Sequence, residues 1–477
     1  MKSLYLFMLA FWATPLLYAK VTLPTVFSDN MVLQQQTQVK FWGNSTAVGH
    51  EVLVKTSWNN KKYKAKVQSN GDWSLNVKTP NYGGPYSITV SDGEELTLNN
   101  ILIGEVWLCS GQSNMQMPLG GWGKIVNYET EIRTANYDKI RFLQVARRTS
   151  PVPLDNAVIA SDGWEAVSSS NISEFSATAY FFARELYLRT GIPIGLIHTS
   201  WGGTSIESWI SPDALSTFPN LQDSVRRVSQ NAALHSDKDD LRNHYTVLYN
   251  AMIHPFINFR IQGAIWYQGE NNAGHPEAYK QLLPAMIKNW RTKWSIGDFP
   301  FYYVQLANFF PKKSEPSESK WAELRDAQKD ALHLPRTGMA VIADIGESDD
   351  IHPKNKQDVG RRLALLALKD TYHYNIISTG PVLQSWHVNK GAVILQFRNS
   401  GVGLALHQGN LFTNGFTIAG KDNVYHHADV DISGNIVVVS SDKVKKPTKV
   451  RYGWADNPDL TLYNSFQLPA SPFQVSK

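Results

Sequence analysis

The chain has 477 residues, of which 43% are hydrophobic and 18% charged, and its net charge is +5. A disordered protein has too few apolar residues to bury a core, so this composition excludes disorder. The length predicts two or three domains. Lysine and arginine are scattered apart from Lys443-Val444-Lys445-Lys446, so the composition argues against nucleic-acid binding.

Residues 1–19 have the pattern of a signal peptide. Lys2 supplies the positive charge, an apolar run follows over 4–17, and Ala19 is a small residue at the expected cleavage site. The alternative is a buried N-terminal strand. No later segment has the roughly 20 apolar residues that a membrane helix needs. We therefore expect a secreted or periplasmic protein with no stable membrane insertion.

Residues 20–100 have the alternating pattern of short β-strands. The runs 51–55, 73–77 and 86–90 alternate apolar and polar residues, and turn signals such as Asn70-Gly71-Asp72 separate them. This segment is predicted to be a β-rich, sandwich-like domain.

Residues 101–375 alternate between apolar strand-like runs and amphipathic helical segments. The predicted strands are 105–109, 140–145, 194–199, 263–267, 301–306 and 339–343, and the helices are 177–189, 242–259, 278–293, 321–332 and 357–368. Such alternation is typical of an α/β fold with a parallel sheet and helices on both faces. Residues 376–477 return to a β pattern and are predicted to be a second β-rich segment.

Polar, glycine-containing segments follow four of the predicted strands. The first is Ser110-Gly111-Gln112-Ser113-Asn114, and the others are 200–204, 268–272 and 344–353. Ligands bind at the carboxyl ends of strands in such sheets. A serine there becomes a nucleophile when a base and free N–H groups lie within reach. Asp349, three residues before His352, could orient that histidine. The single cysteine, Cys109, ends an apolar run and is expected to be buried.

Four blocks together resemble a known family. Gly111-Gln112-Ser113-Asn114-Met115, Trp201-Gly202-Gly203-Thr204, Trp266-Tyr267-Gln268-Gly269-Glu270 and Asp349-Asp350-Ile351-His352-Pro353 resemble the blocks of SGNH (GDSL-like) hydrolases. More closely, the chain resembles the sialate O-acetylesterase branch, and also related acetylxylan esterases. This resemblance implies an SGNH-hydrolase-like sheet and a serine esterase that removes O-acetyl groups from glycans.

The resemblance also implies roles for particular residues. Ser113 matches the nucleophile, His352 the base and Asp349 the orienting acid. The oxyanion would be bound by the N–H groups of Ser113 and Gly203 and by a side-chain amide. For that amide the candidates are Gln268, which we favour, and Asn271 or Asn272, and Gly202 is the alternative to Gly203. We expect the substrate to contact three further residues: Gln112, Trp201 and Glu270.

Other chemistry and other substrates stay open at this point. Asp344 and Glu347 are further candidates for the acid, whereas the side chain of Asp350 is expected to point elsewhere. A metal hydrolase would need a second histidine at ligand spacing, and none follows, so we expect neither a metal nor another cofactor. A sialic acid substrate would need an arginine near Ser113, and a xylan would need aromatic platforms. The candidates are Arg147, Arg148, Arg325, Arg361 and Arg362 for the first, and Trp122, Trp201 and Trp209 for the second.

One alternative belongs to another class of protein. The β-rich flanks would also suit a catalytically inactive carbohydrate-binding protein, although the presence of Ser113, Asp349 and His352 together argues against it. An O-acetylated glycan is the expected binding partner, and the sequence makes no prediction of the oligomeric state.

Overall fold

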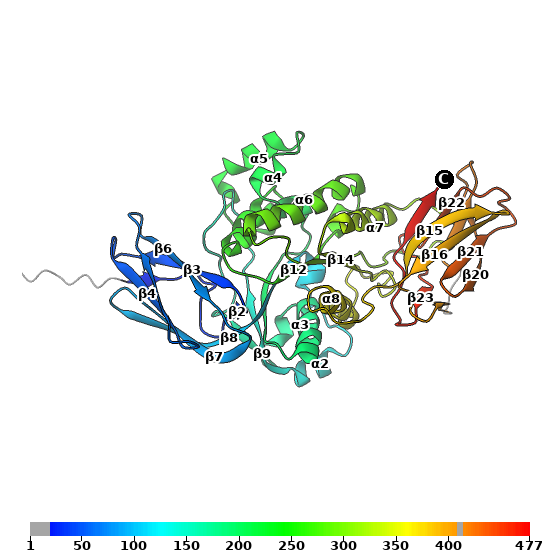
Figure 1. Cartoon of the computed structure of the whole chain (residues 1–477). Helices are drawn as coiled ribbons and strands as arrows, with labels where there is room; N and C mark the ends of the chain where they lie inside the picture. Colours follow the sequence, from blue (N-terminus) through cyan, green and yellow to red (C-terminus); the bar gives the residue numbers. More distant parts are fainter. Residues whose placement is uncertain (1–19, 408–413) are drawn as a thin grey trace, which may run out of the picture.

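The computed structural model describes residues 20–407 and 414–477. A β-rich N-terminal part, a central α/β part and a β-rich C-terminal part lie in a row (Figure 1). The prediction of an α/β centre followed by a β-rich C-terminal part is therefore confirmed. The predicted signal peptide lies outside the described residues. Within the described ranges, no helix is long and apolar enough to cross a membrane.

The central sheet is mostly parallel. Its strands lie in the order β10-β9-β11-β8-β12-β13-β14, and all neighbouring pairs are parallel except β10 with β9. The strands are β8 (Glu95–Gly111), β9 (Asn136–Gln144), β10 (Glu165–Ser168), β11 (Ile194–Ser200), β12 (Gly263–Tyr267), β13 (Phe301–Val304) and β14 (Thr337–Ala340).

Helices cover both faces of this sheet, as the alternating pattern predicted. Val106 and Leu108 of β8 pack into the apolar cluster that contains α6 (Pro276–Trp294) and α7 (Lys320–Asp330). Trp107 and Cys109 point to the other face, which is covered by α3 (Ala177–Thr190) and α8 (Lys356–Asp370). In Figure 1, α6 and α7 lie above the sheet and α3 and α8 below it. The shorter helices are α1 (Ser113–Gln116), α2 (Tyr128–Thr134), α4 (Pro212–Leu215) and α5 (Gln222–Ser229).

The N-terminal β-rich part shares a strand with the central sheet. Strand β8 is 17 residues long, and its first half pairs with β2 and β7 before its second half enters the central sheet. The predicted boundary near residue 100 thus lies within one strand. The remaining strands of this part are β1 (Val21–Thr22), β2 (Val32–Gln34), β3 (Gln38–Ser45), β4 (Glu51–Thr56), β5 (Lys62–Lys66), β6 (Asp72–Lys78) and β7 (Gly83–Ser91).

The C-terminal part consists of small antiparallel sheets around one apolar cluster. One sheet has the order β15-β16-β21-β20, a second has the order β19-β18-β22-β24, and β17 pairs with β23. The strands are β15 (Val382–Asn389), β16 (Ala392–Arg398), β17 (Leu404–Leu406), β18 (Phe416–Ala419), β19 (His426–His427), β20 (Asp429–Ser433), β21 (Ile436–Ser440), β22 (Lys449–Tyr452), β23 (Leu462–Asn464) and β24 (Phe473–Ser476).

One predicted helix is shorter and less regular than expected. Within 242–259 the chain is helical only over 247–256, where two α-helical residues lead into a π-helical turn at Tyr249–Ile253 and a 3-10 turn at His254–Phe256. Thr246 has a φ of 66°, which a β-branched residue rarely adopts within a helix. Pro255 then lacks the N–H that would continue the helical hydrogen bonds. The apolar spacing of this segment reflects burial against the core and not a regular helix.

Candidate active site

Three neighbouring strands of the central sheet end at the same level. Gly111, the last residue of β8, is in register with Ser200 at the end of β11 and with Tyr267 at the end of β12. Strands β11 and β12 lie on opposite sides of β8, so the segments that follow them leave on opposite sides of the nucleophile candidate. This is the arrangement that forms a ligand-binding crevice in α/β sheets.

The chain turns sharply between β8 and Ser113. Gly111 has a φ of 144°, and a Cβ there would lie 2.1 Å from the carbonyl oxygen of Tyr267, so only glycine fits. Helix α1 begins at Ser113, whose side chain is partly exposed. In the described part of the chain, the Ser113 N–H has no acceptor and is free to bind an oxyanion.

A glycine pair from the β11 side lies against Ser113. A Cβ on Gly202 would approach the Ser113 Cβ to 3.1 Å, and the Gly202 N–H donates to Gln116 Oε1 at 2.8 Å. Gly203 has a φ of 69°, and its N–H donates to no acceptor among residues 20–407 and 414–477. Of the two glycines proposed as donors, Gly203 therefore has the free N–H, whereas that of Gly202 is already used.

His352 lies in the segment between β14 and α8. Asp350 Oδ1 accepts a hydrogen bond from the His352 backbone N–H at 2.8 Å and lies 3.3 Å from Nδ1 of its ring. The ring of Trp122 contacts the His352 ring at 5.2 Å between centroids. Burial lowers the pKa of His352, and the nearby positive charge of Lys356 lowers it further against the opposing effect of Asp350. The lower pKa favours the neutral form of the imidazole, in which a histidine can accept a proton.

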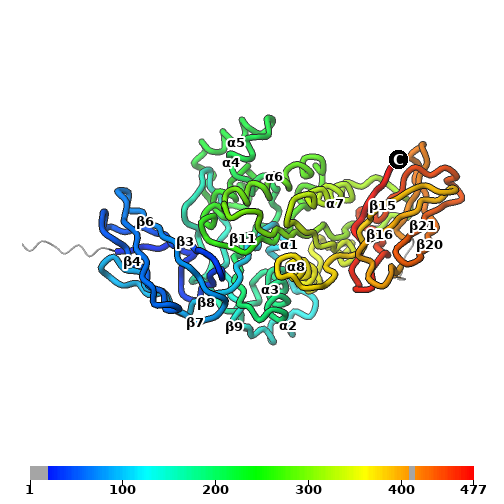
Figure 2. Tube along the Cα trace, in the orientation of Figure 1, coloured from blue at the N-terminus to red at the C-terminus, as the bar shows by residue number. Residues whose placement is uncertain are grey.

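The side chain of Asn114 joins the Ser113 helix to the His352 loop. It is buried, and its Nδ2 donates to Glu270 Oε1 at 2.6 Å and to the carbonyl oxygen of Ile351 at 3.0 Å. Its Oδ1 accepts from Lys356 Nζ at 2.6 Å. Ser113 and His352 are the direct chain neighbours of Asn114 and Ile351, so this amide holds the two segments together. Figure 2 shows α1 beside α8, which begins with Lys356.

Lys356 is a fully buried lysine in this network. Its Nζ also donates to the carbonyl oxygen of Pro353 at 2.8 Å, so it binds the loop that carries His352. Burial lowers the pKa of Lys356 to about 7, against the opposing effect of Glu270. Burial likewise raises the pKa of the Glu270 carboxyl, although its hydrogen bonds and the Lys356 charge act in the other direction. In both cases burial in a region of low dielectric disfavours the charged form of the side chain.

The predicted amide donor Gln268 is engaged elsewhere. Its Nε2 donates to the carbonyl oxygen of Thr204 at 2.9 Å and to Asn272 Oδ1 at 2.7 Å, so both amide hydrogens are used within the protein. The Nδ2 of Asn272 donates to Glu207. Asn271 is exposed and uses Nδ2 for a single bond to Ser205 Oγ, which leaves one amide hydrogen free. The structure therefore favours Asn271 over Gln268.

The three predicted substrate-contacting residues have structural roles. Gln112 is buried, and its Oε1 accepts from the backbone N–H groups of Gly269 and Asn271. Trp201 is 1% exposed and donates from Nε1 to Asp239. The Glu270 carboxylate accepts from Asn114 inside the network described above. These bonds hold the loops of the site, while Glu270 Oε2 and Gln112 Nε2 have no hydrogen-bond partner among the described residues.

The carboxylate beside His352 is not the one that the spacing predicted. Asp349 is exposed and has no hydrogen bond or ion pair within the described ranges, whereas the neighbouring Asp350 contacts His352. A side chain two residues before an N–H can close a tight turn with it, which brings Asp350 to the histidine. Asp344 forms a buried ion pair with Arg362 at 2.6 Å, and Glu347 accepts from the Lys354 N–H.

Two other reactive groups are buried, and one of them, His198, lines the pocket described below. His198 hydrogen-bonds to Ser200 Oγ at 2.7 Å, and burial lowers its pKa to about 4, as expected of a core histidine. Cys109 is fully buried, which raises the pKa of its thiol. Over the described ranges, no three His, Cys, Asp or Glu side chains are grouped as metal ligands would be.

A pocket of about 460 Å³ is lined by residues that contact the segments of Ser113 and His352, although neither Ser113 nor His352 lines it. Its lining includes Gln116, which binds Gly202, and Trp122, which contacts His352. Arg147 and Arg148 also line it. Arg148 forms an ion pair with Asp237, whereas the exposed guanidinium of Arg147 has no acidic partner in the described ranges and lies 5.9 Å from the centre of the Trp201 ring.

Sequence reasoning missed Asn114, Lys356 and the placement of Arg147. Lys356 had a detectable signal, because it falls on the buried face of α8 with Val359, Gly360, Leu363 and Ala367. A charged residue at a core-facing helical position needs a polar partner. Nothing in the local sequence around Arg147 indicates that it faces the same pocket as Trp122.

Comparisons with known proteins agree with these observations. A family model described as carbohydrate esterase, sialic acid-specific acetylesterase, matches residues 103–369. The sialate O-acetylesterase of Homo sapiens is 32% identical over 388 residues, covering 74% of this chain and 72% of the human protein. That of Mus musculus is 31% identical over 415 residues, covering 75% of each.

A solved structure is similar to this protein over nearly the whole chain. The crystal structure of a carbohydrate acetylesterase from Xanthomonas citri has a TM-score of 0.85 and 37% identity, and the match covers 96% of this chain and 100% of that one. The predicted family resemblance is confirmed by these matches. The chain belongs to the sialic acid-specific acetylesterase family of carbohydrate esterases and is an ester-hydrolysing enzyme.

Proposed function

We propose that this protein is a serine sialate O-acetylesterase, which removes O-acetyl groups from sialic acid through an acetyl-serine intermediate. The observation that carries this proposal is the convergence at one sheet edge of Ser113, the free Gly203 N–H and the loop of His352, joined by Asn114. The same edge would serve an acetylxylan or other plant-glycan acetylesterase, so the choice of substrate needs a separate argument.

The proposed reaction has two half-reactions. Ser113 Oγ attacks the acetyl carbonyl carbon while the neutral His352 takes its proton, and the N–H groups of Ser113 and Gly203 and the Asn271 amide stabilise the oxyanion. The C–O bond to the sugar breaks, and the sugar oxygen takes the proton from His352. Water then attacks the acetyl-serine with His352 again as base, which releases acetate and restores Ser113.

Asp350 is the carboxylate whose position supports the orienting role. It lies 3.3 Å from the Nδ1 of His352, and a carboxylate there favours the tautomer that leaves Nε2 free to accept the serine proton. Asp349 is the residue that the family resemblance names. Because the two are adjacent, a rotation of this exposed loop could exchange them, and the choice between them is open to a direct test.

Arg147 supports sialic acid as the substrate. Sialic acid carries a carboxylate that a neutral plant glycan lacks, and arginine binds carboxylates through paired, charge-assisted hydrogen bonds. Of the five arginines considered, Arg325 and Arg362 are buried in structural contacts. Arg148 and Arg361 are paired with aspartates. Arg147 alone among them lines the pocket with no acidic partner in the described ranges.

We expect Ser113→Ala to lower acetate release from a 9-O-acetylated sialoside by about 10⁴-fold or more, because the nucleophile is lost. Ser110→Ala is the matched control. Ser110 is fully buried and its hydroxyl has no partner in the described ranges, so its removal should leave the rate within about twofold. Equal activity of wild type and Ser113→Ala would refute the mechanism.

Asp350→Asn should lower kcat by about 10²-fold or more, because the asparagine no longer stabilises the charged imidazole, whereas Asp349→Asn should stay within about twofold. The measurement is kcat with a soluble aryl acetate, with thermal unfolding as a check on folding. The opposite ranking would assign the orienting role to Asp349 and would mean that the loop rearranges.

Lys356→Met should move the acidic limb of the kcat/KM profile to higher pH. Activity is lost as the pH falls through the pKa of His352, because the protonated imidazole is no base. The Lys356 charge lowers that pKa, so its removal raises it. Lys356→Arg keeps the charge and should keep the midpoint. A fall in kcat with an unchanged midpoint in Lys356→Met would show that the lysine acts only through its hydrogen bonds.

Arg147→Met should lower kcat/KM for the 9-O-acetylated sialoside by roughly 10–100-fold, the usual cost of losing a hydrogen-bonded charge partner. Turnover of a neutral aryl acetate should not change. The control is Arg226→Met, on exposed helix α5, which should affect neither substrate. If the sialoside and aryl acetate rates fall equally, or if acetylated xylan is the better substrate of the wild type, the sialate assignment fails.

A further inference from the structure

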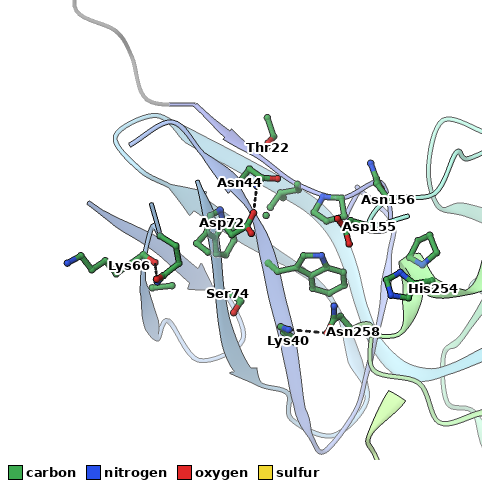
Figure 3. Close-up of a pocket in the computed structure, with 18 residues that line it drawn as sticks. Thr22, Lys40, Asn44, Lys66, Asp72, Ser74, Asp155, Asn156, His254 and Asn258 are labelled. Atoms are coloured by element: carbon green, nitrogen blue, oxygen red, sulfur yellow. Dashed lines mark hydrogen bonds between the residues drawn. The ribbon is translucent and has the colours of Figure 1, made fainter. Parts of the chain in front are cut away.

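A cavity of about 710 Å³ lies between the N-terminal β-rich part and the central part (Figure 3). Strands β3 and β6 form one wall, and the segments 155–156 and 254–258 form the other. Its size falls in the range of small-molecule binding pockets. None of the residues of the proposed ester-cleaving site lines it.

The β3 wall has a polar face with one tryptophan in its centre. Val39 and Phe41 are buried on one face of the strand, so Lys40, Trp42 and Asn44 lie on the other face, toward the cavity. Across the ladder, Trp42 is opposite Ser74, and Asn44 is opposite Asp72 of β6. The aromatic ring is thus surrounded by amide, hydroxyl, carboxylate and ammonium groups.

Trp42 is held in place but keeps an exposed part. Its ring packs against Phe27 at 4.7 Å between centroids with an interplanar angle of 73°. The side chain is partly exposed, and its Nε1–H has no acceptor in the described part of the chain. A fixed aromatic ring with a free N–H presents both a flat apolar surface and a hydrogen-bond donor to a ligand.

The opposite wall supplies further unused polar groups. Asn156 uses Oδ1 to accept from Thr25, which leaves its NH₂ without a partner among the described residues. The carboxylate of Asp155 is exposed and, within the same ranges, accepts no hydrogen bond. Lys40 Nζ donates to Asn258 Oδ1 at 3.0 Å, a contact between the two walls that Figure 3 shows.

The charges of this cavity balance, which indicates a neutral ligand. Two lysines, Lys40 and Lys66, face two aspartates, Asp72 and Asp155, and no arginine lines the cavity. A phosphate or carboxylate ligand would call for an excess of cationic donors. A flat aromatic ring flanked by amides and carboxylates instead suits a sugar, whose C–H face packs on the ring while its hydroxyl groups bind the polar atoms at the ring edge.

We propose that this cavity binds a neutral oligosaccharide, with Trp42 as the platform and Asp155 and Asn156 as hydrogen-bonding partners. It would hold a glycan chain on the enzyme through sugar units that carry no acetyl ester. The proposal does not depend on the identity of the nucleophile, because it uses no residue of the ester-cleaving site.

The test is isothermal titration calorimetry with the full-length Ser113→Ala protein, which should not turn over substrate. The probes are four neutral oligosaccharides: xylohexaose, cellohexaose, mannohexaose and lacto-N-neotetraose. At least one should bind. Adding Trp42→Ala or Asp155→Ala should weaken that binding by about tenfold or more, the effect of removing a platform or a hydrogen bond to a charged group. Asn156→Ala removes a neutral hydrogen bond and should weaken it by roughly fivefold.

Tyr82→Ala is the matched control, because this aromatic side chain is exposed in the same N-terminal part and lines neither pocket, so its removal should leave the binding unchanged. Since Trp42 also packs on Phe27, the two polar variants at exposed positions keep the test valid if Trp42→Ala does not fold. The proposal is overturned if none of the four probes binds at millimolar concentration. It is also overturned if binding survives in both polar variants. Turnover of an aryl acetate by the Asp155→Ala variant of the otherwise native enzyme should be unchanged, which separates this result from the proposed function.

Discussion

The side-chain amide of Asn114 is the interaction on which the candidate active site depends. It satisfies every hydrogen-bonding atom it has, with Glu270 and Ile351 on its NH₂ and Lys356 on its oxygen. The partners come from the segments that follow β12 and β14, while Asn114 itself follows β8. Because a buried polar group without a partner costs about 1–3 kcal/mol, the three segments are stable together in one arrangement. The register of the strands brings them near, and this amide fixes their spacing.

The buried charges of Lys356 and Glu270 beside Asn114 cost desolvation free energy, which apolar side chains in the same positions would not. A lysine and a glutamate in a low-dielectric region lose more hydration energy than an apolar pair would, and stability alone would favour hydrocarbon side chains there. What an apolar pair cannot supply is a positive charge near His352, which works with burial to lower its pKa. The position of Lys356 on the core-facing stripe of α8 is therefore better explained by the chemistry of the site than by the stability of the helix.

The sequence was informative where a feature is local and failed where it depends on contacts between distant segments. The strand Gly263–Tyr267 was predicted with its correct bounds, since a fully apolar run ends in polar residues at both sides. The segment 242–259 was not, because its apolar spacing follows the shape of the surrounding core. The Ser113 turn was recognisable from its own residues. In contrast, the hydrogen bonds that engage the Gln268 amide come from Thr204 and Asn272, which are distant in the sequence or unmarked by any pattern. Which of Asp349 and Asp350 contacts His352 depends on the geometry of one turn.

The N-terminal β-rich part belongs physically to the catalytic sheet. Strand β8 begins in the former and ends at Gly111, two residues before Ser113, so one continuous ladder links the two parts. Glu105, buried in this strand, accepts from Gln34 at 3.1 Å, and the Val106 N–H donates to the same glutamine. Without the N-terminal part, a buried carboxylate whose pKa is already raised by burial would lose its partners. The wall that carries Trp42 belongs to a separate three-stranded sheet, but its buried residues Val39 and Phe41 pack into the same apolar cluster as Val106 and Leu108 of β8. Packing, and not the ladder, therefore joins the Trp42 wall to the strand that positions the candidate nucleophile.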